Sequence, residues 1–126
     1  MIYIWVGLAG IVGAVLRFMV GILTKDWAGS FPLGTLLINC LGAFVLAWLT
    51  TRSPFSTEVR TALGTGMIGS FTTFSTLSVE TVQLFVRGDA WLALLYLLIS
   101  LWGGLLFAWL GYMAASPIRR IRGDEV

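Results

Sequence analysis

The stretch GTGMIGSFTTFSTLSVE, residues 64–80, is rich in polar groups although it lies within a long apolar segment of the chain. It begins with three glycines, continues with closely spaced serines and threonines, and ends on the carboxylic acid Glu80. Polar groups gain nothing from lipid, and at membrane depth each of them needs a hydrogen-bonding partner. We therefore expect this stretch to meet something polar that is neither lipid nor bulk water.

The composition of the whole chain is that of an integral membrane protein. Of its 126 residues, 58% are hydrophobic and only 11% are charged, whereas ordinary soluble domains carry about 25% charged residues. So much apolar surface is expected to contact membrane lipid. The basic residues form no patch with interleaved aromatic side chains, so a nucleic-acid partner is not expected.

Residue types that carry most enzyme chemistry are scarce in this sequence. Histidine is absent and Cys40 is the single cysteine. No nucleophile–base pair and no cluster of metal-binding side chains can be assembled from such a set. We expect neither enzyme activity nor an organic cofactor, and we interpret Cys40 as a small packing residue.

Four apolar segments are expected to cross the membrane within a single all-α domain, at residues 3–24, 32–50, 57–86 and 90–114. A span of about 20 residues crosses the hydrocarbon core. The third segment would extend about 45 Å as one continuous helix, so it must tilt, protrude or break. Glycines and hydroxyl side chains favour a break at residues 69–73, because they tolerate or satisfy unpaired backbone groups.

Two further local patterns concern how the helices begin and how they pack. Ser53 and Pro54 are typical of an N-cap and the first helical position before the third segment. Small residues share one face of the first segment, which predicts a close approach to another helix. That face contains Gly7, Gly10, Ala14 and Gly21, together with Arg17.

Polar side chains recur at helical spacing on the second, third and fourth segments. Each of them taken alone is interpreted as a hydrogen-bonding link between helices. Together they predict a lined pathway, whose hydroxyl, amide and phenol donors suit a small anion that gives up its water. The edges of Phe71 and Phe74 carry partial positive charge and could contact such an anion too. The polar sets are Thr35 with Asn39, Thr72 with Thr76 and Glu80, and Tyr96 with Ser100.

Three of these residues keep two interpretations each. Arg17 either reaches back to the lipid headgroups or lines a polar mouth of the pathway. The Asn39 amide, taken alone, favours a bond across helices, but its N–H groups could also donate to an anion. Glu80 is either a carboxylate bonded to neighbouring hydroxyls or the end of the pathway, and a titrating Glu80 would suit a proton-coupled carrier.

Several motifs make the sequence similar to the CrcB/Fluc family of fluoride channels over nearly its whole length. They are GAVLR at 13–17, PLGTLLINCLG at 32–42, GMIGSFTTFSTLSVE at 66–80 and the pair Gly111–Tyr112. The resemblance implies a passive, fluoride-selective channel that exports fluoride and reduces its toxicity. It also implies an antiparallel, dual-topology homodimer in which two four-helix subunits, each with a broken third helix, enclose two pores.

The resemblance further implies specific roles for individual residues. A structural sodium ion at the dimer interface would be held by the backbone carbonyls of Gly69 and Thr72. Leu77 stands where the family has its second pore phenylalanine, and leucine has no aromatic edge. The expected pore residues are Asn39, Phe74, Ser75, Thr76, Leu77 and Tyr96, and the expected polar track and vestibule comprise Arg17, Thr35, Glu80 and Ser100.

Two other functions are compatible with a chain of this size. A small, dimeric four-helix exporter of drugs or other cations is one, but such exporters depend on an acid in the first helix, where this chain has Arg17. The other is a membrane assembly protein without transport activity, in which the polar residues serve only to link helices.

Overall fold

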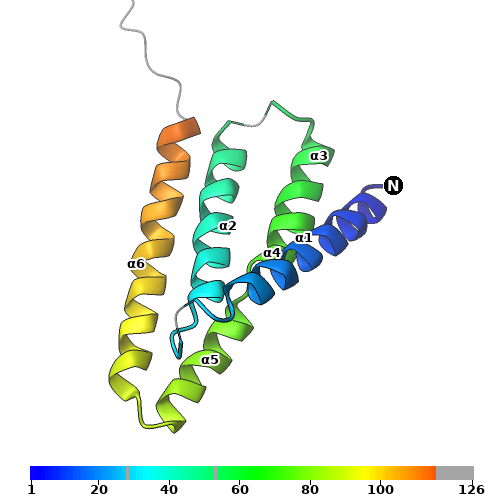
Figure 1. Ribbon diagram of the computed structural model, residues 1–126. Helices are drawn as coiled ribbons and strands as arrows, with labels where there is room; N and C mark the ends of the chain where they lie inside the picture. Colours follow the sequence, from blue (N-terminus) through cyan, green and yellow to red (C-terminus); the bar gives the residue numbers. More distant parts are fainter. Residues whose placement is uncertain (28, 53, 116–126) are drawn as a thin grey trace, which may run out of the picture.

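A computed structural model describes residues 1–27, 29–52 and 54–115, and in these ranges all of the regular secondary structure is helical. The all-α prediction is confirmed. Helix α6 lies beside α2, and α1 crosses obliquely over the middle of the molecule (Figure 1). The elements are α1 (Ile2–Thr24), α2 (Leu33–Thr51), α3 (Thr57–Thr61), the π-helix η1 (Ala62–Ile68), α4 (Gly69–Phe71), α5 (Phe74–Val86) and α6 (Ala90–Ala115).

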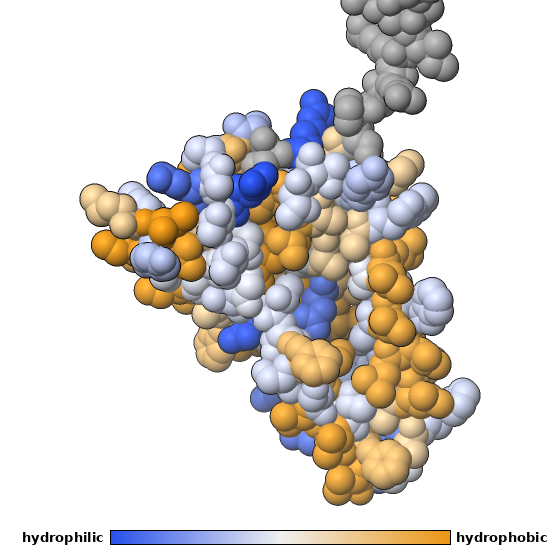
Figure 2. Space-filling view, turned by 180° about the vertical axis from the view of Figure 1, so that it is seen from behind, coloured by the Kyte–Doolittle hydropathy of each residue, from blue (hydrophilic) through white to orange (hydrophobic). Residues whose placement is uncertain are grey.

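Three helices, α1, α2 and α6, are each long and apolar enough to cross a membrane. The third predicted span is built differently, because residues 57–86 form four consecutive helical pieces, α3, η1, α4 and α5. Large apolar side chains are exposed along α1 and α6, and apolar side chains cover much of the surface along α6 (Figure 2). This surface is suited to lipid, as expected for a multi-pass membrane protein.

The predicted helix break is confirmed, and it lies at Thr72 and Thr73. Both residues are extended, with φ/ψ of −76°/157° at Thr72 and −151°/121° at Thr73. Thr73 is the N-cap of α5, and its hydroxyl accepts a hydrogen bond from the backbone N–H of Thr76 at 3.1 Å. A threonine at this position satisfies one of the unpaired N–H groups at the start of a helix.

A seven-residue π-helix, Ala62–Ile68, precedes the break and was not predicted. Glycine is the residue that best tolerates unusual backbone geometry, and this segment contains Gly64 and Gly66. A Cβ at Gly66 would lie 2.5 Å from the carbonyl oxygen of Val6, and a Cβ at Gly13 would collide with the backbone of Met67. Helix α1 therefore crosses η1 in direct backbone contact, as small residues allow in membranes.

The small face predicted on α1 is only partly used for packing. Gly10 lies against Ser70, since a Cβ at Gly10 would be 3.1 Å from the Ser70 hydroxyl. Added side chains at Gly7 and Gly21 would meet no atom within 4 Å among the described residues. The close contact is centred on Gly13, which lies outside the face that the sequence pattern selected.

The N-cap before the third span is Ser56, which corrects the prediction based on Ser53 and Pro54. The Ser56 hydroxyl accepts a hydrogen bond from the backbone N–H of Val59 at 3.4 Å. Pro54 precedes the helix, and Ser53 lies outside the described residues.

One cluster of the subunit core lies between α5 and α6. Its members are Leu77, Leu84, Ala93 and Tyr96, and Tyr96 is fully buried. Three partly buried residues pack around them: Phe31 from the loop before α2, Leu36 from α2 and Leu92 from α6. This packing fixes α5 against α6 on the far side of the break from α1.

The crossing of α1 and η1 makes a stability prediction. Gly13→Ala should lower the free energy of unfolding by about 1–3 kcal/mol, because the added methyl group overpacks a backbone contact. Gly21→Ala is the matched control on the same helix, and it should be neutral or slightly stabilising. Unfolding in mixed detergent micelles, titrated with dodecyl sulfate, measures both. Equal stability of the two variants would contradict the close contact at Gly13.

Candidate functional site

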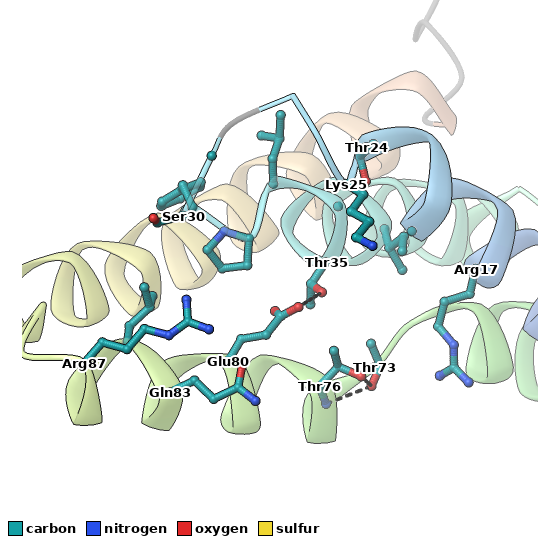
Figure 3. Close-up of a pocket in the computed structure, with 18 residues that line it drawn as sticks. Arg17, Thr24, Lys25, Ser30, Thr35, Thr73, Thr76, Glu80, Gln83 and Arg87 are labelled. Carbon is teal, nitrogen blue, oxygen red and sulfur yellow. Dashed lines mark hydrogen bonds between the residues drawn. The ribbon is translucent and has the colours of Figure 1, made fainter.

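A polar cavity of about 410 Å³ opens between α1, α2 and α5, next to the loop that joins α1 to α2. Hydroxyl, amide and charged side chains converge on it from three directions (Figure 3). Its charged residues are three cations and one acid, so an anion entering it meets a net positive charge. The polar lining comprises Arg17, Thr24, Lys25, Ser30, Thr35, Thr73, Thr76, Glu80, Gln83 and Arg87.

Glu80 is the point where three helices meet in this site. Its Oε1 accepts a hydrogen bond from the Thr35 hydroxyl on α2 at 2.9 Å, and its Oε2 accepts one from the Tyr96 hydroxyl on α6 at 2.7 Å. The Tyr96 ring is held in place by the edge of Phe31, whose centroid is 5.5 Å away at an interplanar angle of 81°. Hydrogen bonds to a carboxylate are stronger than those between neutral groups, so the carboxylate has a defined orientation.

Asn39 pairs with the backbone of Thr73 at the helix break. Its Nδ2 donates to the carbonyl oxygen of Thr73 at 3.0 Å, and its Oδ1 accepts from the N–H of Thr73 at 2.9 Å. Both backbone groups of this extended residue are therefore satisfied by one side chain. A primary amide has two N–H donors, and this pairing occupies one of them. The geometry supports the link between helices and leaves a donor for a further partner.

A short row of hydroxyl groups continues from the break into the cavity. The Thr73 hydroxyl donates to that of Thr76 at 2.9 Å and lies 3.2 Å from that of Ser75. Thr73 is buried, whereas Ser75 and Thr76 are exposed on the subunit surface. Rotatable hydroxyls of this kind can donate to an anion or accept from water without moving the backbone.

The break also redirects the N–H groups that a continuous helix would use. In a continuous helix the N–H of Thr73 would donate to the carbonyl of Gly69, but here it donates to the Asn39 side chain. Likewise, the N–H of Thr76 would donate to the carbonyl of Thr72, but here it donates to the Thr73 hydroxyl. The carbonyls of Gly69 and Thr72 thus lose their helical partners. Within the described ranges no three His, Cys, Asp or Glu side chains gather to hold a metal, so carbonyl oxygens are the donors that this region offers to a cation.

The remaining predicted residues lie in four different environments. Phe74 is 79% exposed and points away from the subunit. Leu77 belongs to the core between α5 and α6, so it does not line the cavity. The Ser100 hydroxyl is buried on α6, and it has no hydrogen-bond partner among the residues that the structure describes. Arg17 lines the cavity, as one of its two interpretations required.

Five of the polar lining residues were not selected from the sequence: Thr24, Lys25, Ser30, Gln83 and Arg87. Thr73 was predicted only as part of the helix break. A signal for two of them was present, because Glu80, Gln83 and Arg87 follow the i, i+3, i+7 spacing of one helix face. Lys25 and Ser30 are in the loop after α1, whose path over the cavity depends on tertiary structure.

The chain is similar to known proteins over most of its length. The family model described as "CrcB-like protein, Camphor Resistance (CrcB)" matches residues 4–112. The chain is 49% identical over 125 residues to the fluoride-specific ion channel FluC 2 of Geobacillus kaustophilus, covering 95% of this chain and 97% of the relative. It is 54% identical over 117 residues to FluC 1 of Bacillus cereus, covering 89% and 81%. FluC 2 of Moorella thermoacetica is 43% identical over 121 residues, covering 94% and 99%.

The hydrogen bond from Tyr96 to Glu80 makes a testable contribution to stability. Tyr96→Phe should lower the free energy of unfolding by about 1–3 kcal/mol, because it leaves a carboxylate oxygen without its buried donor. Tyr3→Phe, at a position that is 86% exposed, is the matched control and should be neutral. A double-mutant cycle with Glu80→Gln isolates the pair. Additive effects of Tyr96→Phe and Glu80→Gln would show that the bond contributes nothing.

Proposed function

The chain belongs to the CrcB family, and on this basis we propose that it is a fluoride-specific ion channel that lets fluoride leave the cytoplasm passively. Export of this kind reduces fluoride toxicity. The observation that carries the proposal is the identity of about half of all residues, over most of the chain, to relatives named as fluoride-specific channels. The stretch at residues 66–80 supplies the polar groups that such a function needs.

Fluoride holds its water tightly, so a pathway for it has to offer hydrogen-bond donors in exchange. The cavity has room for several water molecules, each of which occupies about 30 Å³ in the liquid, so it suits a hydrated ion. In its lining the hydroxyls of Thr73 and Thr76 can replace water molecules. The Ser75 hydroxyl and the second N–H of Asn39, which lie outside the lining, can do the same. The exposed Phe74 can add its ring edge.

Glu80 acts in this proposal as a positioning residue. Its two oxygens accept hydrogen bonds from the Thr35 and Tyr96 hydroxyls, and these bonds fix the directions of both side chains. The remaining lone pairs can orient water or the neighbouring hydroxyls toward the ion. This role needs no change in the protonation of Glu80, so it separates a passive channel from a proton-coupled carrier.

We propose that the working unit is a homodimer, with antiparallel subunits as the family resemblance implies, in the bacterial inner membrane. One subunit exposes Phe74, Ser75 and Thr76 side by side on α5. Lipid cannot hydrogen-bond to the two hydroxyls, so a second copy placed over this surface would complete the pathway.

A structural sodium ion is compatible with the residues present at the break. The carbonyls of Gly69 and Thr72, freed from their helical bonds, are hard oxygen donors of the type that bind alkali cations in broken membrane helices. Two subunits would supply four such oxygens. A bound cation there would balance the carbonyl dipoles and join the subunits.

Flux from liposomes distinguishes this function from its alternatives. We expect purified protein to release fluoride rapidly, without chloride release and without dependence on a proton gradient, as measured with ion-selective electrodes. Uptake of organic cations driven by a proton gradient would instead support the exporter, and absence of any flux would support an assembly protein.

Asn39→Asp should reduce fluoride flux by more than tenfold, because the new carboxylate repels the ion. Two like charges about 4 Å apart repel each other by about 4 kcal/mol at an effective dielectric of 20. Elution of the variant as an intact dimer is the control for folding. A variant with the flux of the wild type would remove Asn39 from the pathway.

Removal of sodium tests the cation site independently of flux. Replacing sodium by N-methylglucamine at constant ionic strength should lower the thermal unfolding midpoint of the dimer. A ligand at about 100 times its dissociation constant contributes about 2.7 kcal/mol to stability. An unchanged midpoint would argue against a sodium ion held by Gly69 and Thr72.

A further inference from the structure

The mouth of the cavity carries two cations that the polar pathway does not use, Lys25 and Arg87. Lys25 is the C-cap residue of α1, and Arg87 is the C-cap residue of α5. Both line the cavity, and their side chains extend toward it from opposite walls, with Glu80 between them (Figure 3). Two separate loops thus place positive charge at one entrance.

The acids on the same loops lie elsewhere. Asp26 follows Lys25 and Asp89 lies two residues after Arg87, so each loop is neutral overall, yet neither acid lines the cavity. In the described part of the chain, neither Lys25 nor Arg87 takes part in an ion pair. Glu80, the one acid in the lining, has both oxygens engaged by Thr35 and Tyr96. Because Arg17, Lys25 and Arg87 outnumber this single carboxylate, the lining keeps a net positive charge.

From this arrangement we propose that Lys25 and Arg87 form an unselective collecting site for hydrated anions, which raises the fluoride concentration at the entrance. The inference rests on the proposed channel function and adds residues and a physical role to it. Both side chains are exposed, so they hold no ion as tightly as a buried site would. They act through their field, which a cavity with low-dielectric walls focuses.

A field effect differs from a contact effect in its dependence on salt. The screening length is about 30 Å at 0.01 M ionic strength and about 3 Å at 1 M. Charges at the mouth therefore act on an approaching ion in dilute solution and lose this action at high salt. Selection of fluoride over other anions occurs deeper, at the hydroxyls and the amide, so the collecting site changes the rate of entry and leaves selectivity unchanged.

The experiment compares Lys25→Gln/Arg87→Gln with the wild-type protein in liposomes. Initial fluoride efflux is measured by electrode, at fluoride concentrations far below saturation and with sodium kept constant. Potassium gluconate sets the ionic strength to about 0.01 M or about 1 M. We expect the variant to be at least about threefold slower at low ionic strength, within the range of electrostatic steering, and equal to the wild type at high ionic strength.

Two control variants fix the interpretation. Asp26→Asn/Asp89→Asn removes two negative charges from the same loops, whereas the test variant removes two positive ones. Its fluoride efflux at low ionic strength should be at least as fast as that of the wild type. Lys25→Arg/Arg87→Lys keeps both charges and should keep the wild-type rate. A ratio of variant to wild type that is the same at both ionic strengths would overturn the collecting site. Absence of fluoride flux in the wild type would instead contradict the channel function.

Discussion

The pairing of the Asn39 amide with the backbone of Thr73 is the interaction on which the rest of the site depends. At membrane depth an extended residue exposes an N–H and a carbonyl that lipid cannot satisfy, and one side chain from α2 satisfies both. The break can therefore persist, with Thr72 and Thr73 extended. Because the helix stops there, Thr73 caps a new helix, and its hydroxyl accepts from the backbone N–H of Thr76 and donates to the Thr76 hydroxyl.

The location of the break and the convergence of polar residues could be predicted from sequence because both follow from local chemistry. Glycines and hydroxyls mark where a membrane helix can be interrupted, and the helical period places Thr35, Glu80 and Tyr96 on faces that can meet. Other features depend on contacts between distant residues. The π-helix and the Gly13 crossing exist because α1 packs against η1, and no local pattern distinguishes Gly13 from Gly7 or Gly21.

The remaining differences have the same origin. Ser53 and Ser56 are both residues of the type that caps a helix. Which of them is the N-cap depends on where the helix begins, and the Ser56 hydroxyl is the one that accepts a hydrogen bond from the N–H of Val59. Within the subunit Leu77 belongs to the same core cluster as Tyr96, and the pore role that the family resemblance implies for it stays a prediction. The sequence did not predict the cations at the cavity mouth as site residues, because short loops carry charges in most proteins. Only the path of these loops over the cavity distinguishes Lys25 and Arg87 from ordinary surface residues.

The two halves of the broken helix are attached to different neighbours. The first half, η1 with α4, packs mainly against α1, α5 packs mainly against α6, and α2 contacts both halves. The two extended residues between them join the halves, and Asn39 on α2 is hydrogen-bonded to this joint. If α1 tilted within the bilayer, it would carry the Gly69 carbonyl with it while Glu80, Tyr96 and Thr35 stayed together.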